Sequence, residues 1–286
     1  LPTMADSQKT ILITGCSRGI GLRCAEILKQ RGWRVFASAR NRADVEQLQG
    51  QGFESLQLDL DDSHSIQSAV KRTLELSGGT LDALFNNGAY GQPGAVEDLS
   101  RDTLRRQFET NLFGTAELIN SVIPTMRRQG HGRIVQNSSV LGFVVMPYRG
   151  AYNASKFALE GLTDTLRLEL KGTGIHLSLI QPGPIESKFR SNAFQAFKAH
   201  IDPTNSPHRA NYEAMEQRLQ KPGPAAPFTL PADAVAKKLI HALESRHPKS
   251  RYPVTFPTYL FAFLKRLLPD RWLDTILLKA SGDGKR

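Results

Sequence analysis

Residues 10–21 read TILITGCSRGIG, an apolar run followed by a glycine-rich turn. The run at 10–13 is typical of a strand that is buried on both faces of a parallel sheet. The apolar residues from Ile20 onward recur at helical spacing. Glycines allow a tight turn and a close approach of the backbone to a ligand, and a helix N-terminus attracts phosphate. The stretch therefore predicts a strand, a turn that binds a pyrophosphate, and a helix.

A glycine-rich turn on its own can equally be a turn that binds no ligand. The interpretation as a phosphate site therefore depends on a second motif. Residues 152–156 read YNASK, and Ser139 lies thirteen residues before Tyr152. Because Tyr152 and Lys156 are four residues apart, they lie on one face of a helix. A nearby ammonium lowers the pKa of a phenol, which is about 10 when unperturbed. With a serine hydroxyl to hold a carbonyl or alcohol oxygen, the trio suits proton transfer coupled to hydride movement.

Together the two motifs resemble the short-chain dehydrogenase/reductase family, over about residues 9–250, and in particular its NADP-preferring branch of bacterial aldehyde reductases and retinol or steroid dehydrogenases. The family's patterns are matched, in order, by 14–21, Asp59 with Leu60, Asn86 with Asn87, Asn111, Ser139, Tyr152 with Lys156, and 182–185. One departure is an exchange within the family's Asn-Asn-Ala-Gly motif, which ends here in Gly88 and Ala89.

The resemblance implies an α/β protein, a single-domain Rossmann fold with a doubly wound, seven-stranded parallel sheet in the order 3-2-1-4-5-6-7 and helices on both faces. The alternating pattern places strands at about 10–14, 34–39, 54–58, 82–86, 132–137, 175–181 and 251–255. It places helices at about 19–31, 42–50, 63–77, 101–128, 151–171 and 231–245.

Three segments are expected along the chain. Residues 1–8 are expected to be a disordered N-terminus or an artificial addition before Met4. Residues 9–255 are expected to form the NADP-binding catalytic domain, including a substrate-covering segment at 188–230. Residues 256–286 form an apolar and basic C-terminal extension.

The second predicted strand decides the cofactor that we expect. An acidic residue at its end holds the ribose 2′-hydroxyl of NAD, whereas an arginine accommodates the 2′-phosphate of NADP. Here that strand ends in Arg40, and Arg18 lies in the glycine turn. Asp44 is a possible alternative as the acidic residue that binds the ribose hydroxyl, but it lies beyond the strand, in the next predicted helix. Since guanidinium groups match phosphate geometry, NADP is the expected cofactor.

The resemblance also implies the roles of individual residues. Tyr152 is the expected proton donor, Lys156 lowers its pKa and holds the nicotinamide ribose, Ser139 polarises the carbonyl, and Asn111 supports a water-linked proton relay. The other residues expected to bind the cofactor are Gly15, Ser17, Arg18, Gly19, Ile20, Gly21, Arg40, Asp59, Leu60, Asn87, Gly88, Pro182, Gly183, Ile185 and Ser187.

Composition narrows the classes of protein that the chain can be. With 286 residues and 40% hydrophobic residues, it can bury a large core. The two cysteines, Cys16 and Cys24, suggest no disulfide framework and are typical of a reducing cytoplasm. No signal peptide is visible, and the seven histidines show no metal-ligand spacing, so no metal is expected.

The C-terminal segment carries much of the formal net charge of +10. Residues 246–286 hold nine Lys or Arg and three Asp or Glu, a net +6. Nucleic-acid binding fits poorly, because no such module is present and the segment is also apolar. Its apolar runs are too short to span about 30 Å of hydrocarbon. Three interpretations remain: packing on the core or a partner subunit, closure of the substrate pocket, or contact with an anionic membrane surface through Trp272 and the basic residues.

The substrate is indicated only indirectly. Residues 140–148 are mostly apolar, as is part of 188–230, and we expect no additional Arg or Lys near the catalytic residues that could bind a substrate carboxylate. We therefore expect a lipophilic aldehyde or ketone, reduced by a cytoplasmic homodimer or homotetramer. Two rivals are an NADP-binding regulator without turnover and a peripheral membrane scaffold. The presence of both Tyr152 and Lys156 argues against the regulator.

Overall fold

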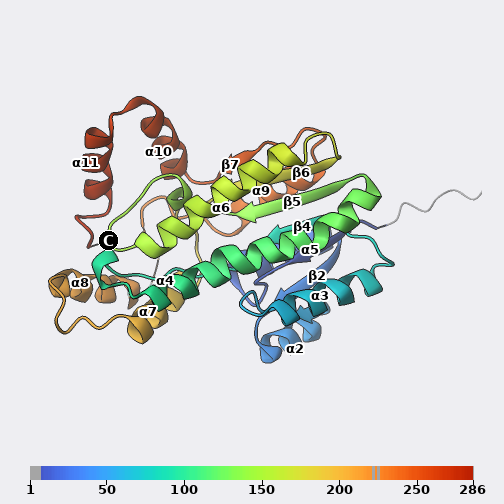
Figure 1. The fold of residues 1–286 in the computed structure, drawn as a ribbon, viewed down its shortest axis with the longest axis horizontal. Coiled ribbons are helices and arrows are strands. Elements are labelled where there is room, and N and C mark those ends of the chain that lie inside the picture. The colour runs from blue at the N-terminus through green and yellow to red at the C-terminus, as the bar shows by residue number, and fades with distance from the viewer. Residues whose placement is uncertain (1–7, 221–222, 224–225, 286) are drawn as a thin grey trace, which may run out of the picture.

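The computed structural model describes residues 8–220, 223 and 226–285. They form a seven-stranded parallel sheet in the order β3-β2-β1-β4-β5-β6-β7, as expected (Figure 1). The strands are β1 Thr10–Ile13, β2 Arg34–Ala39, β3 Glu54–Gln57, β4 Ala83–Asn86, β5 Gly132–Asn137, β6 Ile175–Gln181 and β7 Arg251–Pro253. The expectation for residues 1–7 lies outside the described residues.

Each strand is followed by a helical connection, which the parallel sheet requires. The helices are α1 Gly19–Gln30, α2 Arg42–Gly50, α3 Ser63–Leu76, α4 Arg101–Phe108, α5 Gly114–Gln129, α6 Gly150–Glu169, α7 Phe189–His200, α8 Arg209–Gln220, α9 Asp233–Glu244, α10 Phe256–Leu267 and α11 Asp270–Ala280. The single Rossmann-like domain is thus confirmed, and the expected element ends agree within about two residues in most cases.

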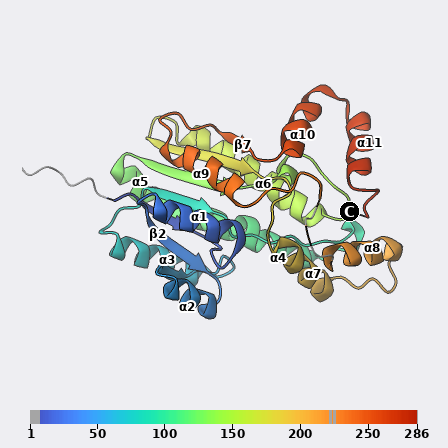
Figure 2. The ribbon, with the colours of Figure 1, turned by 180° about the vertical axis from the view of Figure 1, so that it is seen from behind.

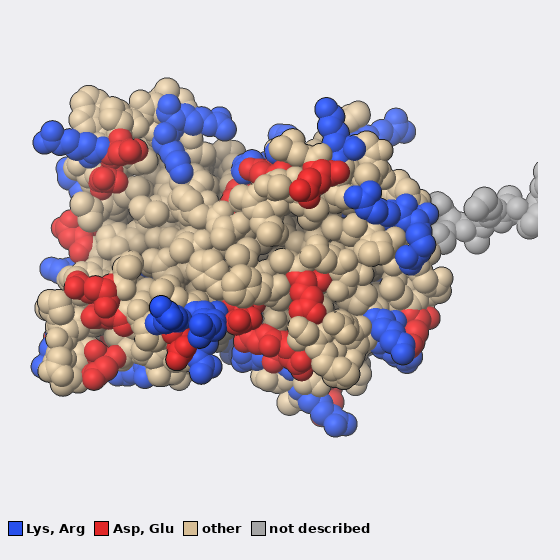
Figure 3. Space-filling view, viewed as in Figure 1, with Lys and Arg blue, Asp and Glu red and all other residues tan. Residues whose placement is uncertain are grey.

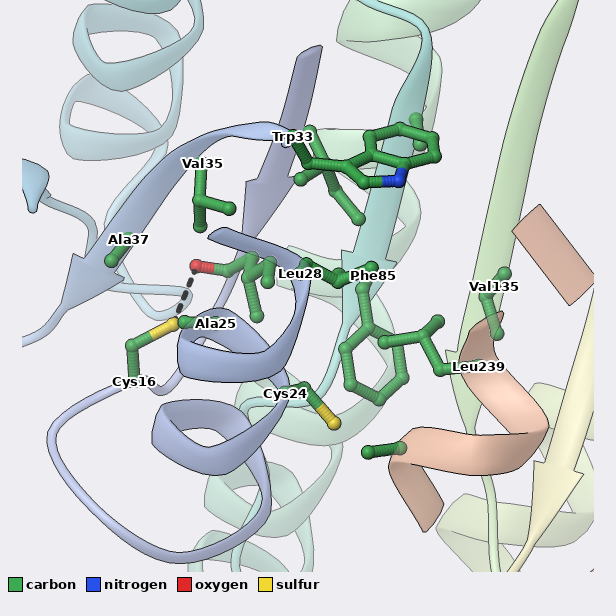
Figure 4. Close-up of a cluster of buried hydrophobic side chains, with 14 of the residues drawn as sticks. Cys16, Cys24, Ala25, Leu28, Trp33, Val35, Ala37, Phe85, Val135 and Leu239 are labelled. Carbon is green, nitrogen blue, oxygen red and sulfur yellow. Dashed lines mark hydrogen bonds between the residues drawn. The ribbon is translucent and has the colours of Figure 1, made fainter. Parts of the chain in front are cut away.

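The sheet has a hydrophobic core on each face, because neighbouring strand residues point to opposite sides. In β1, Ile11 and Ile13 pack toward α1, α2 and α9, whereas Leu12 packs toward α3 and α5. Figure 4 shows the first of these cores, in which Cys24 lies close to Phe85 and Leu239. Burial on both faces explains why the strands read as continuous apolar runs.

The helix expected at 101–128 is interrupted. It consists of α4, a π-helical turn over Glu109–Phe113, and α5. A Cβ on Gly114 would lie 1.8 Å from the main-chain oxygen of Leu60, so this part of the helix passes directly against the loop after β3. The irregular turn holds Asn111, and π-helical turns of this kind are frequent at functional sites.

Four helices lie beyond the carboxyl ends of the strands. Figures 1 and 2 show α7, α8, α10 and α11 gathered at this end of the molecule, with the start of α6. Helix α7 agrees with the near-helical spacing of phenylalanines in 188–230, whereas α8 was not expected. The two helices α10 and α11 form a hairpin, named here the C-terminal hairpin. In open parallel sheets, ligands bind at this edge.

Candidate active site

The glycine turn leaves the N-terminus of α1 open. Gly15 and Gly19 have positive φ angles of 69° and 62°, which side chains disfavour. A Cβ on Gly21 would lie 2.3 Å from the main-chain oxygen of Gly15, so only glycine fits this close turn. In the described part of the chain no side chain caps α1. The first amides of the helix are therefore not capped by a side chain, which fits the binding of a pyrophosphate.

Asn87 joins the glycine turn to the neighbouring strands. Its Nδ2 donates to the main-chain oxygens of Thr14 and Gly15, at 3.1 and 3.2 Å. Its Oδ1 accepts a hydrogen bond from Asn137 Nδ2 at 2.9 Å. The hydroxyl of Thr14 accepts from the amides of Asn87 and Gly88, both at 2.9 Å. These bonds hold the ends of β1, β4 and β5 together at the sheet edge.

Gly88 lies in a narrow space, which bears on its exchange with Ala89. A Cβ on Gly88 would lie 3.2 Å from a methyl carbon of Leu60 and 3.3 Å from the hydroxyl of Thr14. Leu60 is buried there, while Asp59 is partly exposed and its amide donates to Ser65 Oγ at 2.9 Å. The structure therefore brings Asp59, Leu60 and Gly88 to the glycine turn, where the wall of a cofactor site would be.

Arg18 and Arg40 are both exposed at the same edge. Arg18 is the residue before α1, and Arg40 directly follows β2. Neither guanidinium takes part in an ion pair with another described residue. The main-chain oxygen of Arg40 accepts from Gln57 Nε2 at 3.0 Å, which fixes the backbone at the end of β2. Both side chains remain available to a phosphate.

Ser139 and Tyr152 meet at the carboxyl edge, as the spacing predicted. Ser139 lies two residues beyond β5, and its Oγ accepts from the amide of Leu141 at 3.1 Å. Tyr152 lies in the first turn of α6. Burial raises the pKa of Tyr152 to about 12, while a hydrogen bond with Ser139 and the charge of Arg149 act to lower it. The phenol is therefore protonated at neutral pH, as a proton donor must be.

Lys156 lies one turn further along α6 and is buried. Its Nζ lies 5.7 Å from the centroid of the Tyr152 ring and donates to the main-chain oxygen of Asn137 at 2.7 Å. Burial lowers the pKa of Lys156 to about 8, although the charge of Glu160 acts to raise it. We expected Lys156 to lower the pKa of Tyr152. Lys156 is not among the groups that shift this pKa, and burial, which raises it, is the largest cause.

Asn111 lies near the trio in the π-helical turn. Its Nδ2 donates to the main-chain oxygen of Tyr90 and to Ser155 Oγ, both at 3.0 Å. Its Oδ1 accepts from the amide of Tyr90 at 3.2 Å. The amide thus ties the loop after β4 to α6. The expected proton relay through water stays a prediction.

The loop after β6 completes the edge. The main-chain oxygen of Pro182 accepts from the amide of Val140 at 2.8 Å, so this loop lies against the Ser139 segment. A Cβ on Gly183 would lie 2.0 Å from Thr255 Oγ1. Ile185 pairs with Leu230, and Ser187 lies next to Gly19, 3.6 Å from where a Cβ on that glycine would be. The loop therefore reaches the glycine turn.

The sequence analysis missed a buried carboxylate behind the trio. Glu160 accepts hydrogen bonds from Ser138 Oγ at 2.6 Å and from Gln181 Nε2 at 2.8 Å, and it pairs with Arg251 at 3.0 Å. These contacts tie the ends of β5, β6 and β7 to α6. Glu160 lies four residues after Lys156, a spacing that signals a shared helix face, but its partners are distant in sequence.

Two further residues beside Tyr152 were also missed. Arg149 precedes α6, three residues before Tyr152, and its charge acts on the phenol. Our view that no additional basic residue stands nearby is therefore wrong. Phe189, the first residue of α7, packs edge-on against the Tyr152 ring with centroids 5.3 Å apart.

A surface hollow of about 500 Å³ lies elsewhere on the molecule, and neither Arg149 nor Phe189 lines it. Its lining residues are Ala95, Val96, Glu97, Pro147, Tyr148 and His208.

The C-terminal hairpin packs beside the trio. Phe261, Leu273 and Leu277 form one buried cluster with Val140 and Val144, and Tyr152 lies partly buried against it. Of the three interpretations of the C-terminal segment, packing on its own core is therefore observed. The position of the cluster also agrees with closure of a substrate pocket.

This site agrees with the comparison against protein families, in which residues 9–197 match the model of the short chain dehydrogenase family. The chain belongs to this family. Members of the family bind nicotinamide cofactors, and the glycine turn with the uncapped N-terminus of α1 fits such a dinucleotide. Among the described residues, no His, Cys, Asp and Glu group is arranged to hold a metal ion, and no helix is long and apolar enough to cross a membrane.

Individual relatives extend the similarity beyond the family model. The chain is 42% identical over 270 residues to the uncharacterized oxidoreductase YbbO of Escherichia coli K12, covering 94% of each chain. It is 30% identical to an NADPH-dependent 3-dehydrocapnine reductase of Ornithobacterium rhinotracheale, covering 94% of this chain and 95% of the relative. It is 32% identical to human 17-beta-hydroxysteroid dehydrogenase type 1, covering 92% and 82%.

Solved structures agree. A short-chain dehydrogenase/reductase of Burkholderia phymatum in complex with NAD superimposes with a TM-score of 0.75 at 27% identity, covering 92% of this chain and 94% of that one. The protein is thus an oxidoreductase with relatives among steroid dehydrogenases.

Proposed function

We propose that the protein is an NADP(H)-dependent reductase of lipophilic aldehydes or ketones, with Tyr152 as the proton donor. The observation that carries this proposal is the placement of Tyr152 with Ser139 and Lys156 beside the glycine turn that leads to Arg18 and Arg40. It works, in this proposal, as a cytoplasmic homodimer or homotetramer.

The preference for NADP rests on charge. Arg18 and Arg40 are exposed, free of ion pairs with other described residues, and follow adjacent strands. No carboxylate stands at the end of β2 to bind a ribose hydroxyl. An NADPH-dependent relative supports this choice, whereas a solved relative holds NAD, so the cofactor needs a direct test.

The proposed mechanism assigns one task to each side chain. When bound, the nicotinamide supplies the hydride. Ser139 donates a hydrogen bond to the carbonyl oxygen, and Tyr152, protonated at neutral pH, donates its proton to that oxygen. Lys156, held near the phenol by the main-chain oxygen of Asn137, stabilises the phenolate that remains. Phe189 and the hairpin cluster offer apolar walls for a lipophilic substrate.

An Arg40→Asp variant tests the cofactor. A charge-assisted hydrogen bond contributes about 1.5–3 kcal/mol, or roughly one to two decades of affinity. The variant loses this bond and places a carboxylate near the phosphate, so kcat/KM for NADPH should fall by at least about tenfold. NADH should be little affected.

Steady-state kinetics with both cofactors measure the ratio, and Arg42→Asp, two residues further on and paired with Glu46 on the surface of α2, is the matched control. The preference should also shrink with salt, because the contact is exposed. Equal use of NADH and NADPH by the unmodified protein would contradict NADP specificity.

A further inference from the structure

Helix α10 is apolar on two opposite faces. Thr258 and Phe261 are buried against the molecule. The outward face carries residues at i, i+3, i+4, i+7 and i+11, which form one continuous line on a helix. This line, named here the apolar stripe, consists of Phe256, Tyr259, Leu260, Phe263 and Leu267. Most of this second apolar face is left uncovered by the described part of the chain.

The exposure of the stripe is large. Phe263 and Leu267 are each 61% exposed, and Phe256 is 58% exposed. Phe228, from a distant part of the sequence, adds its ring to the stripe with its centroid 5.1 Å from that of Phe256. Trp272, at the start of α11, is 64% exposed. Single exposed apolar residues are ordinary, but a contiguous apolar surface rimmed by polar residues marks an interaction site.

Basic side chains border the stripe. Arg266 lies between Phe263 and Leu267 in sequence, Arg271 precedes Trp272, and Lys238 of α9 donates to the Tyr259 hydroxyl at 3.3 Å. Figure 3 shows basic side chains projecting from the region of the C-terminal hairpin, with a few acidic ones among them. The whole chain has a formal net charge of +10.

We propose that the apolar stripe binds the surface of an anionic lipid bilayer. An aromatic and leucine-rich helix face with basic neighbours lies in the interface of such a bilayer, with rings at the headgroup boundary and long basic side chains toward the phosphates. A second copy of the chain fits the stripe less well, since stripe against stripe would bring two basic rims together. None of the described helices can cross the bilayer, so the hairpin lies on it.

This inference rests on the proposed function in one respect: it assumes that a lipophilic substrate passes from the bilayer to Tyr152. The inner side of the same hairpin packs in the cluster that includes Val140 and Tyr152. A hairpin docked on lipid therefore places the proposed substrate site at the edge of the bilayer. A lipophilic carbonyl can then reach Tyr152 without crossing bulk water.

Co-sedimentation of the full chain with vesicles tests the proposal. Vesicles of about 30% phosphatidylglycerol in phosphatidylcholine are compared with pure phosphatidylcholine, since only the former is anionic. The variants are Leu267→Ser and the double variant Phe263→Ser with Leu267→Ser. Val96→Ser is the matched control, because Val96 is 69% exposed but lies far from the hairpin in sequence, in the loop after β4. All three substitutions are at exposed positions and leave the core unchanged.

We expect the unmodified chain and the control to sediment with the anionic vesicles only, and the double variant to lose at least about tenfold in partition coefficient. Absence of binding to anionic vesicles, or equal binding to both kinds, would overturn the proposal. So would a change from dimer to monomer in the double variant without lipid, which would assign the stripe to a second copy. Reduction of a panel of lipophilic aldehydes and ketones with NADPH is measured separately, without vesicles, so its failure would refute the proposed function and not the membrane surface.

Discussion

At the residue scale, Lys156 sets the expected pH dependence. Its pKa is lowered to about 8 by burial, so it loses its charge as the pH rises past this value. Only the charged form can attract the phenolate and hold a ribose hydroxyl as a full donor. We therefore expect kcat/KM for NADPH, which reports the free enzyme, to be constant well below pH 8 and to fall as the pH rises through about 8. Steady-state kinetics between pH 6 and 10 measure this profile.

Glu160 provides the control for that profile. Its charge raises the pKa of Lys156, and its oxygens hold Ser138 and Gln181. Glu160→Gln keeps an acceptor in place but removes the charge, so the fall in kcat/KM should begin at a lower pH. A profile that stays the same in this variant would show that Lys156 is not the titrating group.

The placement of site residues could be predicted from the sequence where it is local, whereas their roles stay predictions. Tyr152 and Lys156 share one helix, and Ser139 was located by its spacing to Tyr152. Glu160 was not recognised, because most of its partners are far away in sequence. Arg149 was overlooked although it lies only three residues before Tyr152. The expected direction of the pKa shift of Tyr152 was also wrong, because burial raises this pKa. The sequence shows which charges are close along the chain, but it does not show how far a side chain is removed from water.

At the element scale, α7 contributes Phe189 to the site. The ring packs edge-on against Tyr152 and also against Gly91, where a Cβ would lie 2.6 Å from it. Phe189→Ala removes an apolar contact worth about 1 kcal/mol for a half-buried ring, or about fivefold in affinity. We expect KM for a long aldehyde such as decanal to rise by about this factor, with kcat nearly unchanged. Butanal is the control, because it is too short to need the ring. Equal effects on both aldehydes would contradict this role.

The arrangement of elements was predictable in the sheet and less so around it. Apolar strands followed by amphipathic helices predicted a parallel sheet, because parallel strands need such crossovers. The strand order, which the structure confirms, came from the resemblance to the family. The π-helical turn at Glu109–Phe113 was missed, since the helical spacing of the apolar residues continues through it; it lies next to Gly114, which closely approaches Leu60. Helix α8 was missed because it belongs to a polar segment whose few apolar residues, among them Tyr212 and Met215, pack on α7 and not on the sheet.

At the scale of the whole molecule, exposed apolar residues on α6 support the proposed oligomer. Leu162 and Leu168 are exposed on this helix, and Phe113 is exposed beside it. Leu168→Glu should disrupt a dimer that pairs through α6, because it places a charge in the interface. Light scattering should give at least twice the chain mass of 31.7 kDa for the unmodified protein and a lower mass for the variant. A mass of 31.7 kDa for the unmodified protein at micromolar concentration would refute the dimer.

The central claim, that Tyr152 donates the proton in a reduction driven by NADPH, has one direct test. The rate of NADPH oxidation is followed by its absorbance with a panel of lipophilic aldehydes, retinoids and ketosteroids, for the unmodified protein and for Tyr152→Phe. NADPH binding is measured in parallel by fluorescence titration. We predict turnover of at least one carbonyl, a loss of about a hundredfold or more in kcat for the variant, and nearly unchanged NADPH affinity. Near-normal turnover by Tyr152→Phe, or no turnover of any carbonyl by the unmodified protein, would contradict the account.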